Sequence, residues 1–108
     1  MTQIHEITRW DSVLLNGGLI PKPIIYIHPN EDLKHLTENV CNKLIITINT
    51  SEQNYNRTMT GVIRKSEFVP NLRYNFFDMT GLYVIILDSQ WYGYPFHKGT
   101  VTINKMME

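Results

Sequence analysis

A short segment near the C-terminus, WYGYPFH at positions 91–97, concentrates the side chains best suited to binding another molecule. Aromatic rings bury large apolar areas and are enriched at protein interfaces, and the same rings can stack on a sugar or on a single-stranded base. Four aromatic residues in this short segment therefore indicate either a contact surface or a satellite core packed beneath a sheet. The candidate binding residues are Trp91, Tyr92, Tyr94, Phe96 and His97.

The other reactive side chains form no catalytic or metal-binding pattern. The histidines give no His-x-His or His-Glu-x-x-His motif, and a single cysteine, Cys41, excludes a Cys-x-x-Cys site. On a helix, Cys41 and His35 would point in different directions, so we expect a buried, unreactive thiol. Asp78 and Asp88 bracket an expected strand and are too far apart to act as a carboxylate pair. The sequence therefore predicts no catalytic residue, no metal ligand and no cofactor, and we expect a protein that is not an enzyme.

Charge and hydropathy exclude further classes of partner. Lys and Arg number 10 against 10 Asp and Glu, and the pI is near 6.9, so the basic surface that nucleic acid requires is missing. No apolar run is long enough to span a membrane, and the charged N-terminal residues are not typical of a signal peptide. We therefore expect synthesis in the cytoplasm and a partner that is neither nucleic acid nor membrane.

Length and composition set the fold class. A chain of 108 residues makes one domain, spanning residues 1–108. It has no alanine but 13 Ile, 10 Thr and 10 Asn, which enriches it in β-branched residues and turn formers and removes the best helix former. A mainly β domain follows. The same bias is what AT-rich codons produce, which suggests a low-GC bacterium, a phage or a large virus as the source.

The aromatic segment lies between the two clearest predicted strands, so that residues 78–105 read as one hairpin. Residues 82–87 are apolar on both strand faces, which is typical of a central strand or of one covered by a loop, a helix or a partner. Residues 100–105 alternate, with Val101 and Ile103 on one face and polar residues on the other, which is typical of a half-buried antiparallel strand. The two strands are expected to hold the aromatic segment as their connection.

The rest of the chain predicts further strands and one helix. Asn30 is placed to cap a helix over residues 30–42, in which Leu33, Leu36 and Val40 share one face. Gly61 is a candidate for a bulge in its strand. Strands are expected within 4–15 and at 24–27, 43–50, 58–64 and 72–77. The inward strand residues are expected to be Leu44, Ile46, Ile48, Leu82, Val84, Ile86, Val101 and Ile103.

Two stretches, Gly81-Leu82-Tyr83 with the strand that follows and Gly99-Thr100-Val101-Thr102-Ile103, carry a family resemblance. They resemble the last two strands of immunoglobulin-like sandwich modules found in bacterial surface and phage virion proteins. The resemblance implies an antiparallel two-sheet sandwich of about seven strands, in which Tyr83 anchors the corner between the sheets. The helix predicted at 30–42 departs from the simplest of these modules and keeps an α+β fold open as the alternative.

Two classes of function follow from these expectations. In the first, the protein is a non-enzymatic structural or protein-interaction module, such as a decoration, capsid or tail accessory component of a phage or viral particle. Its partner is then another protein or a second copy of itself. In the second, the protein binds carbohydrate or another small ligand through the aromatic segment 91–97. The missing catalytic set and the two apolar faces of the strand at 82–87 favour the first class.

Overall fold

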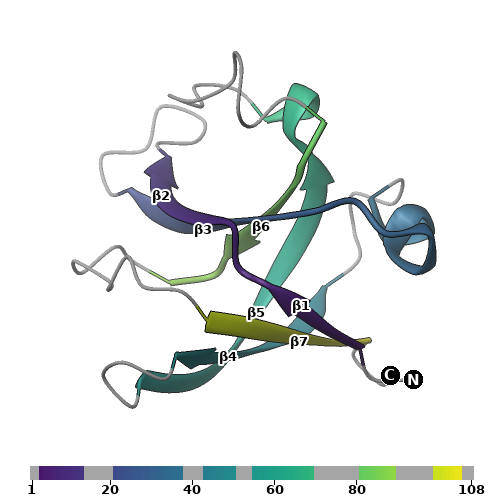
Figure 1. Cartoon of the computed structure of the whole chain (residues 1–108). Coiled ribbons are helices and arrows are strands. Elements are labelled where there is room, and N and C mark those ends of the chain that lie inside the picture. The colour runs from purple at the N-terminus through teal and green to yellow at the C-terminus, as the bar shows by residue number, and fades with distance from the viewer. Residues whose placement is uncertain are drawn as a thin grey trace.

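All described strands of the computed structural model belong to one antiparallel sheet (Figure 1). The structure describes residues 3–13, 21–37, 43–50, 55–69, 81–89 and 99–105. The strands are β1 (Gln3–Glu6), β2 (Arg9–Val13), β3 (Lys22–Ile27), β4 (Leu44–Thr50), β5 (Tyr55–Lys65), β6 (Tyr83–Leu87) and β7 (Gly99–Lys105). Two short 3-10 helices are described as well, η1 (Glu31–Leu36) and η2 (Ser66–Phe68). The mainly β fold predicted from the composition is confirmed.

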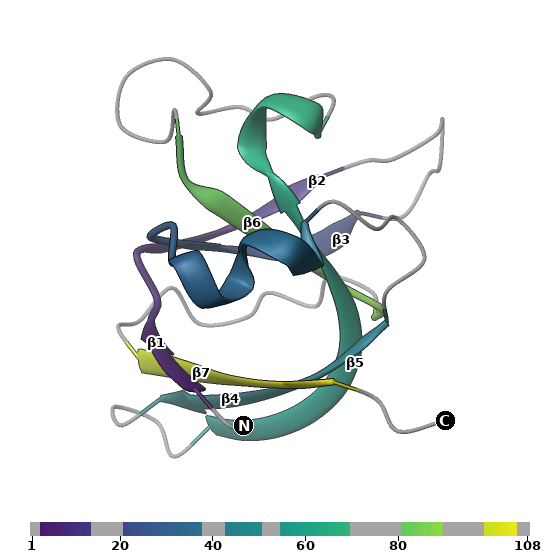
Figure 2. The same ribbon diagram turned by 90° about the vertical axis from the view of Figure 1, so that its right-hand side faces the viewer.

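The sheet is curled, and its strand order is β1-β7-β4-β5-β6-β3-β2. β1 and β2 follow each other in sequence yet lie at opposite edges of the sheet, so the chain passes from one edge to the other between them (Figure 2). The N–H of Ile7 donates to the carbonyl oxygen of Gly99 at 2.9 Å, and the N–H of Thr8 donates to that of Tyr26 at 2.8 Å. The N-terminal stretch thereby ties β7 to β3 and holds the sheet in the shape of a half-barrel.

The strongly curved strand β5 carries the sheet around its bend (Figure 2). Its first half pairs with β4 and its second half with β6, and Gly61 is paired on both sides, with Leu44 and Leu87. The register with β4 ends at Gly61 and the register with β6 begins there, and neither contains an extra residue, so the pairing shows no bulge at this predicted position. The glycine instead permits a close approach of two strands, because a Cβ at this position would lie 2.6 Å from the carbonyl oxygen of Ile86.

Because β5 pairs with both halves, the described strands form one sheet and not the two separate sheets of the expected sandwich. The alternation of apolar and polar residues shows which face of a strand is buried. A curled sheet buries its concave face in the same way as a sandwich buries its two inner faces. The sequence pattern therefore could not distinguish the two architectures.

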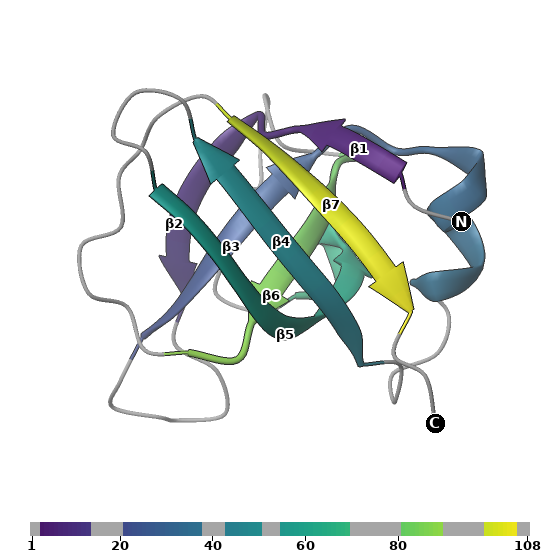
Figure 3. The same cartoon turned by 90° about the horizontal axis from the view of Figure 1, so that it is seen from below.

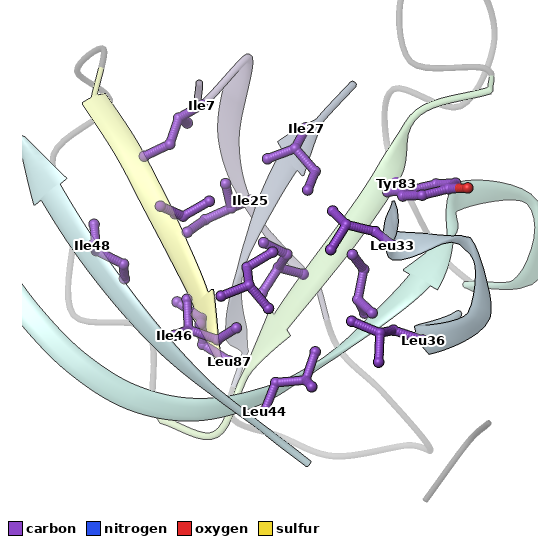
Figure 4. Close-up of a cluster of buried hydrophobic side chains, with 14 of the residues drawn as sticks. Ile7, Ile25, Ile27, Leu33, Leu36, Leu44, Ile46, Ile48, Tyr83 and Leu87 are labelled. Atoms are coloured by element: carbon purple, nitrogen blue, oxygen red, sulfur yellow. The ribbon is translucent and has the colours of Figure 1, made fainter. Parts of the chain in front are cut away.

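The concave side of the sheet encloses the main hydrophobic core (Figure 4). At its centre, Ile25, Ile85 and Ile63 are paired across β3, β6 and β5, and all three are fully buried. Leu33 and Leu36 point from η1 into this core. The predicted inward residues of β4 and β7 are confirmed, namely Leu44, Ile46, Ile48, Val101 and Ile103.

A second cluster covers the convex side of β3 and β6. It contains Val84 and Ile86 of β6 together with Ile24 and Tyr26 of β3, and also Val69, which directly follows η2. The prediction that the strand at 82–87 is covered on both faces is confirmed. The assignment of Leu82, Val84 and Ile86 to the inward face is wrong, since the main core instead contains Tyr83, Ile85 and Leu87. With apolar residues on both faces, a period of two cannot tell the inner face from the outer one.

The hairpin predicted over residues 78–105 is also wrong, because β5 and β4 lie between β6 and β7. The alternation within a strand shows its faces but not its neighbours. Three strand spacings amount to about 14 Å, a distance that a connection from Asp88 to Lys98 spans easily. The strand predicted at 72–77 lies outside the described residues.

A short 3-10 helix replaces the first part of the helix predicted at 30–42. Asn30 caps it as predicted, since its side-chain oxygen accepts a hydrogen bond from the N–H of Asp32 at 2.8 Å. The N–H of Thr37 then donates to the carbonyl of Lys34, three residues back, which is the 3-10 pattern. Positions 38–42, which include Val40 and Cys41, lie outside the described residues. The described part contains almost no helix, which favours the mainly β class over the α+β alternative.

Candidate functional site

The predicted binding residues Trp91, Tyr92, Tyr94, Phe96 and His97 lie outside the described residues. Of the other histidines, His28 and His35 are exposed and His5 is half-buried, each on a separate part of the fold. Within the described ranges, no three His, Cys, Asp or Glu side chains gather as a metal site would require. The candidate site is therefore defined by the residues that anchor the aromatic segment and by the surface beside them.

Asp88 anchors the start of the connection that contains the aromatic segment. Its N–H donates to the carbonyl oxygen of Thr60 at 2.9 Å. Its carboxylate accepts hydrogen bonds from Lys43 Nζ at 2.6 Å and from the Thr60 hydroxyl at 2.8 Å, and Lys22 Nζ lies 3.8 Å away. Partial burial would raise the pKa of Asp88, but the two hydrogen bonds and the two lysine charges outweigh it and lower the pKa below 3.8. The start of the connection is thus fixed to β5.

Gly99 anchors the other end of the connection. It pairs with Thr50, and a Cβ at position 99 would lie 2.4 Å from the carbonyl oxygen of Asn49, so only glycine fits without displacing β4. Its own carbonyl accepts the hydrogen bond from Ile7. Asp88 and Gly99, described residues that flank the predicted binding residues, therefore lie beside β5 and β4.

The convex side of β1, β7, β4 and β5 carries a continuous polar face with almost no charge (Figure 3 shows these strands). The strand registers align its outward side chains in three rows. The rows are Asn104, Ile45 and Thr60, then Ile4, Thr102, Thr47 and Thr58, and last Glu6, Thr100, Asn49 and Asn56. We call this surface the threonine–asparagine face. It borders both anchors, because Thr60 binds Asp88 and Thr100 follows Gly99.

The chemistry of the threonine–asparagine face is that of neutral hydrogen-bonding groups. Hydroxyls and amides both donate and accept, and neighbouring strands place them about 4.8 Å apart. The hydroxyls of Thr47 and Thr58 are hydrogen-bonded to each other at 3.2 Å. Among these side chains only Glu6 is charged, and Ile4 is 70% exposed, the one large hydrophobic residue so exposed in the described part of the chain. The face can therefore bind a neutral polar partner.

Sequence reasoning predicted polar outer faces for single strands but missed the surface that they build together. The signal was present in the outward positions of β4 and β7, which carry no Lys, Arg, Asp or Glu between Ile45 and Asn49 or between Thr100 and Asn104. The strand order was needed to show that β1 and β5 extend the same face.

His5 is a second chemically distinctive residue. It shares its strand face with the buried Val101, its register partner, and so points to the concave side. Its Nε2 atom is buried, and no group within the described residues forms a hydrogen bond with it. Burial lowers the pKa of His5 below 6.5, and the nearby negative charge of Asp32 on η1 offsets this only in part.

We expect the free energy of unfolding to fall as the pH decreases below 6.5, because the unfolded chain then binds a proton at His5 that the folded chain does not. Stability from the neutral imidazole is fully present above 6.5. Urea unfolding at a series of pH values measures the effect, and His5→Phe should flatten the curve. The matched variant at an exposed histidine, His35→Gln, should keep the parent's profile. A profile unchanged by His5→Phe would assign the effect to other groups.

Comparisons of the chain with protein-family models, with curated proteins and with solved structures find no match. Neither helical turn in the described ranges has the length and apolar character needed to cross a membrane.

Proposed function

We propose that this protein is a non-enzymatic interaction module of a larger protein assembly, in which the threonine–asparagine face contacts a protein partner. One observation carries the proposal. Charged residues make up 19% of the chain, yet among the eleven outward side chains that define this face only Glu6 is charged. Charged residues are depleted at the centre of protein interfaces, whereas free protein surfaces are commonly rich in them.

The neutrality of the face also indicates the kind of partner. A charged surface placed against it would lose hydration without gaining a counter-charge, which costs free energy. A neutral partner that offers donors and acceptors can satisfy the hydroxyl and amide groups instead. Association through this face should therefore depend little on salt concentration, unlike association through ion pairs.

The sequence resemblance of β6 and β7 to immunoglobulin-like modules of bacterial surface and phage virion proteins motivates the same role, although β5 and β4 separate the two strands in this sheet. The two walls of the curled sheet oppose each other across the main core and would take the place of the two layers of such a sandwich. The assembly that we propose is a phage or viral particle, with this chain as a decoration, capsid or tail accessory component.

Amine-reactive cross-linking in the cells or particles that produce the protein tests the proposal. Lys43 borders the threonine–asparagine face through Asp88, whereas Lys65 lies at the far end of β5. We expect cross-links to another polypeptide from Lys43 but few from Lys65. Thr102→Glu places a charge on the face and should remove the Lys43 cross-links. The matched variant Thr8→Glu, at an exposed site outside the face, should retain them. Cross-links unchanged by Thr102→Glu would reject this face as the contact surface.

A second candidate, carbohydrate binding, is favoured by the position of the anchors. Asp88 and Gly99, which precede and follow Trp91, Tyr92 and Tyr94 in sequence, border a face of hydroxyl and amide groups. A sugar chain is a neutral ligand rich in hydroxyls. Retention of the parent chain on an oligosaccharide array, lost in Trp91→Ala, would support this candidate. The protein-contact proposal instead predicts that the chain is not retained on the array and that Lys43 forms cross-links.

A further inference from the structure

We infer that the partner of the threonine–asparagine face is a second copy of this chain, bound face to face about a two-fold axis. The inference rests on the proposed function, because it names the partner of the same face. Two properties carry it, the self-complementary chemistry of the face and the position of its single charge, and the size of the face sets the expected affinity.

The chemistry of the face is self-complementary. A two-fold contact brings one patch against an identical patch, so each group must be able to pair with its own kind. Threonine hydroxyls and asparagine amides satisfy this condition, because each donates and accepts hydrogen bonds. A patch rich in lysine or in carboxylates would fail, because like charges would meet across the contact.

The single charge lies at a corner of the face where a two-fold contact can accommodate it. An axis that runs along the strands between β4 and β7 places β1 of one copy over β5 of the other. Glu6 then lies opposite Asn56 of the second copy, whose amide can donate to the carboxylate. The exposed Ile4 is covered by the threonine methyl groups of β5. Thr47 and Thr102 of the two copies meet near the axis.

The size of the face predicts a weak dimer. Its eleven side chains compare with about 20–30 residues a side in an interface of standard size. The outer side of a curled sheet is also convex, so the two copies approach most closely at β4 and β7 and less closely at β1 and β5. We therefore expect a dissociation constant on the order of 10 μM.

Sedimentation velocity of the purified full chain over a concentration series that brackets the micromolar range tests the inference. The parent should shift from monomer to dimer. Thr47→Lys places two like charges near the axis and should weaken association by at least about tenfold. Thr8→Lys makes the same change at an exposed site outside the face and should leave association unchanged. Circular dichroism checks that each variant is folded.

A mixture of variants tests the two-fold arrangement itself. Thr47→Lys and Thr47→Glu should each be monomeric alone, and an equimolar mixture should associate again, because opposite charges then meet near the axis. If Thr47→Lys dimerises as strongly as the parent, the inference is overturned. A parent that stays monomeric overturns it as well, and the proposed function survives only if Lys43 still cross-links to a different protein. A monomeric parent without such cross-links overturns both.

Discussion

Replacement of Ile85 by alanine is expected to lower the free energy of unfolding by about 4 kcal/mol. Ile85 is fully buried at the centre of the main core, between its register partners Ile25 on β3 and Ile63 on β5. Truncation removes buried methyl and methylene groups, and a sheet tied together at both edges cannot collapse to fill the cavity. The loss is a large part of the roughly 5–15 kcal/mol that stabilises a domain.

Urea unfolding followed by circular dichroism measures this effect. If Ile85→Ala does not fold, Ile85→Val provides a milder truncation that should cost about 1 kcal/mol. The matched control is Ile45→Ala, which removes the same groups from a partly exposed outward position on β4 and should cost much less. Equal losses at the two positions would mean that the concave side of the sheet is not the main core.

The single strands were predictable from sequence wherever one face is apolar and the other polar. β4 and β7 show this alternation, and both their boundaries and their inward residues match the structure within a residue. β6 has two apolar faces. The sequence therefore predicted that both faces are covered, but it could not show which face points to the main core. The local sequence pattern shows that a strand is buried, whereas the face that points to the main core depends on how the strand is placed in the sheet.

The neighbours of each strand were not predictable, because hydrogen-bonded pairing leaves little trace in a single strand's composition. The hairpin prediction failed at this point, since β6 pairs with β3 and β5, which are remote in sequence. The same holds for the candidate site. Lys43 and Asp88 are 45 positions apart, and only the adjacency of β4, β5 and β6 brings them together. The threonine–asparagine face likewise depends on the pairing of β4 with β5 and β7, and the pairing of β7 with β1 extends it.

Gly61 is the residue on which the bend of the sheet depends most directly. It is paired with Leu44 on one side and Leu87 on the other, at the point where β5 passes from one half of the sheet to the other. A methyl group here would lie 2.6 Å from the carbonyl oxygen of Ile86. The obstacle is backbone and not a flexible side chain, so β5 and β6 would have to move apart.

We therefore expect Gly61→Ala to destabilise the protein by about 3 kcal/mol, the upper part of the range for overpacking. The sign of the change in stability is informative. An alanine that met no obstacle would stabilise the protein by about 0.4–1 kcal/mol, because it reduces the conformational entropy of the unfolded chain. Thr58→Ala, at an exposed outward site on the same strand, should change stability by no more than about 0.5 kcal/mol. Amide hydrogen exchange should also accelerate between β5 and β6 in Gly61→Ala and remain slow between β4 and β7, because only the first pair is forced apart. A Gly61→Ala protein as stable as the parent would show that the close approach of β5 to Ile86 is not what sets the curl of the sheet.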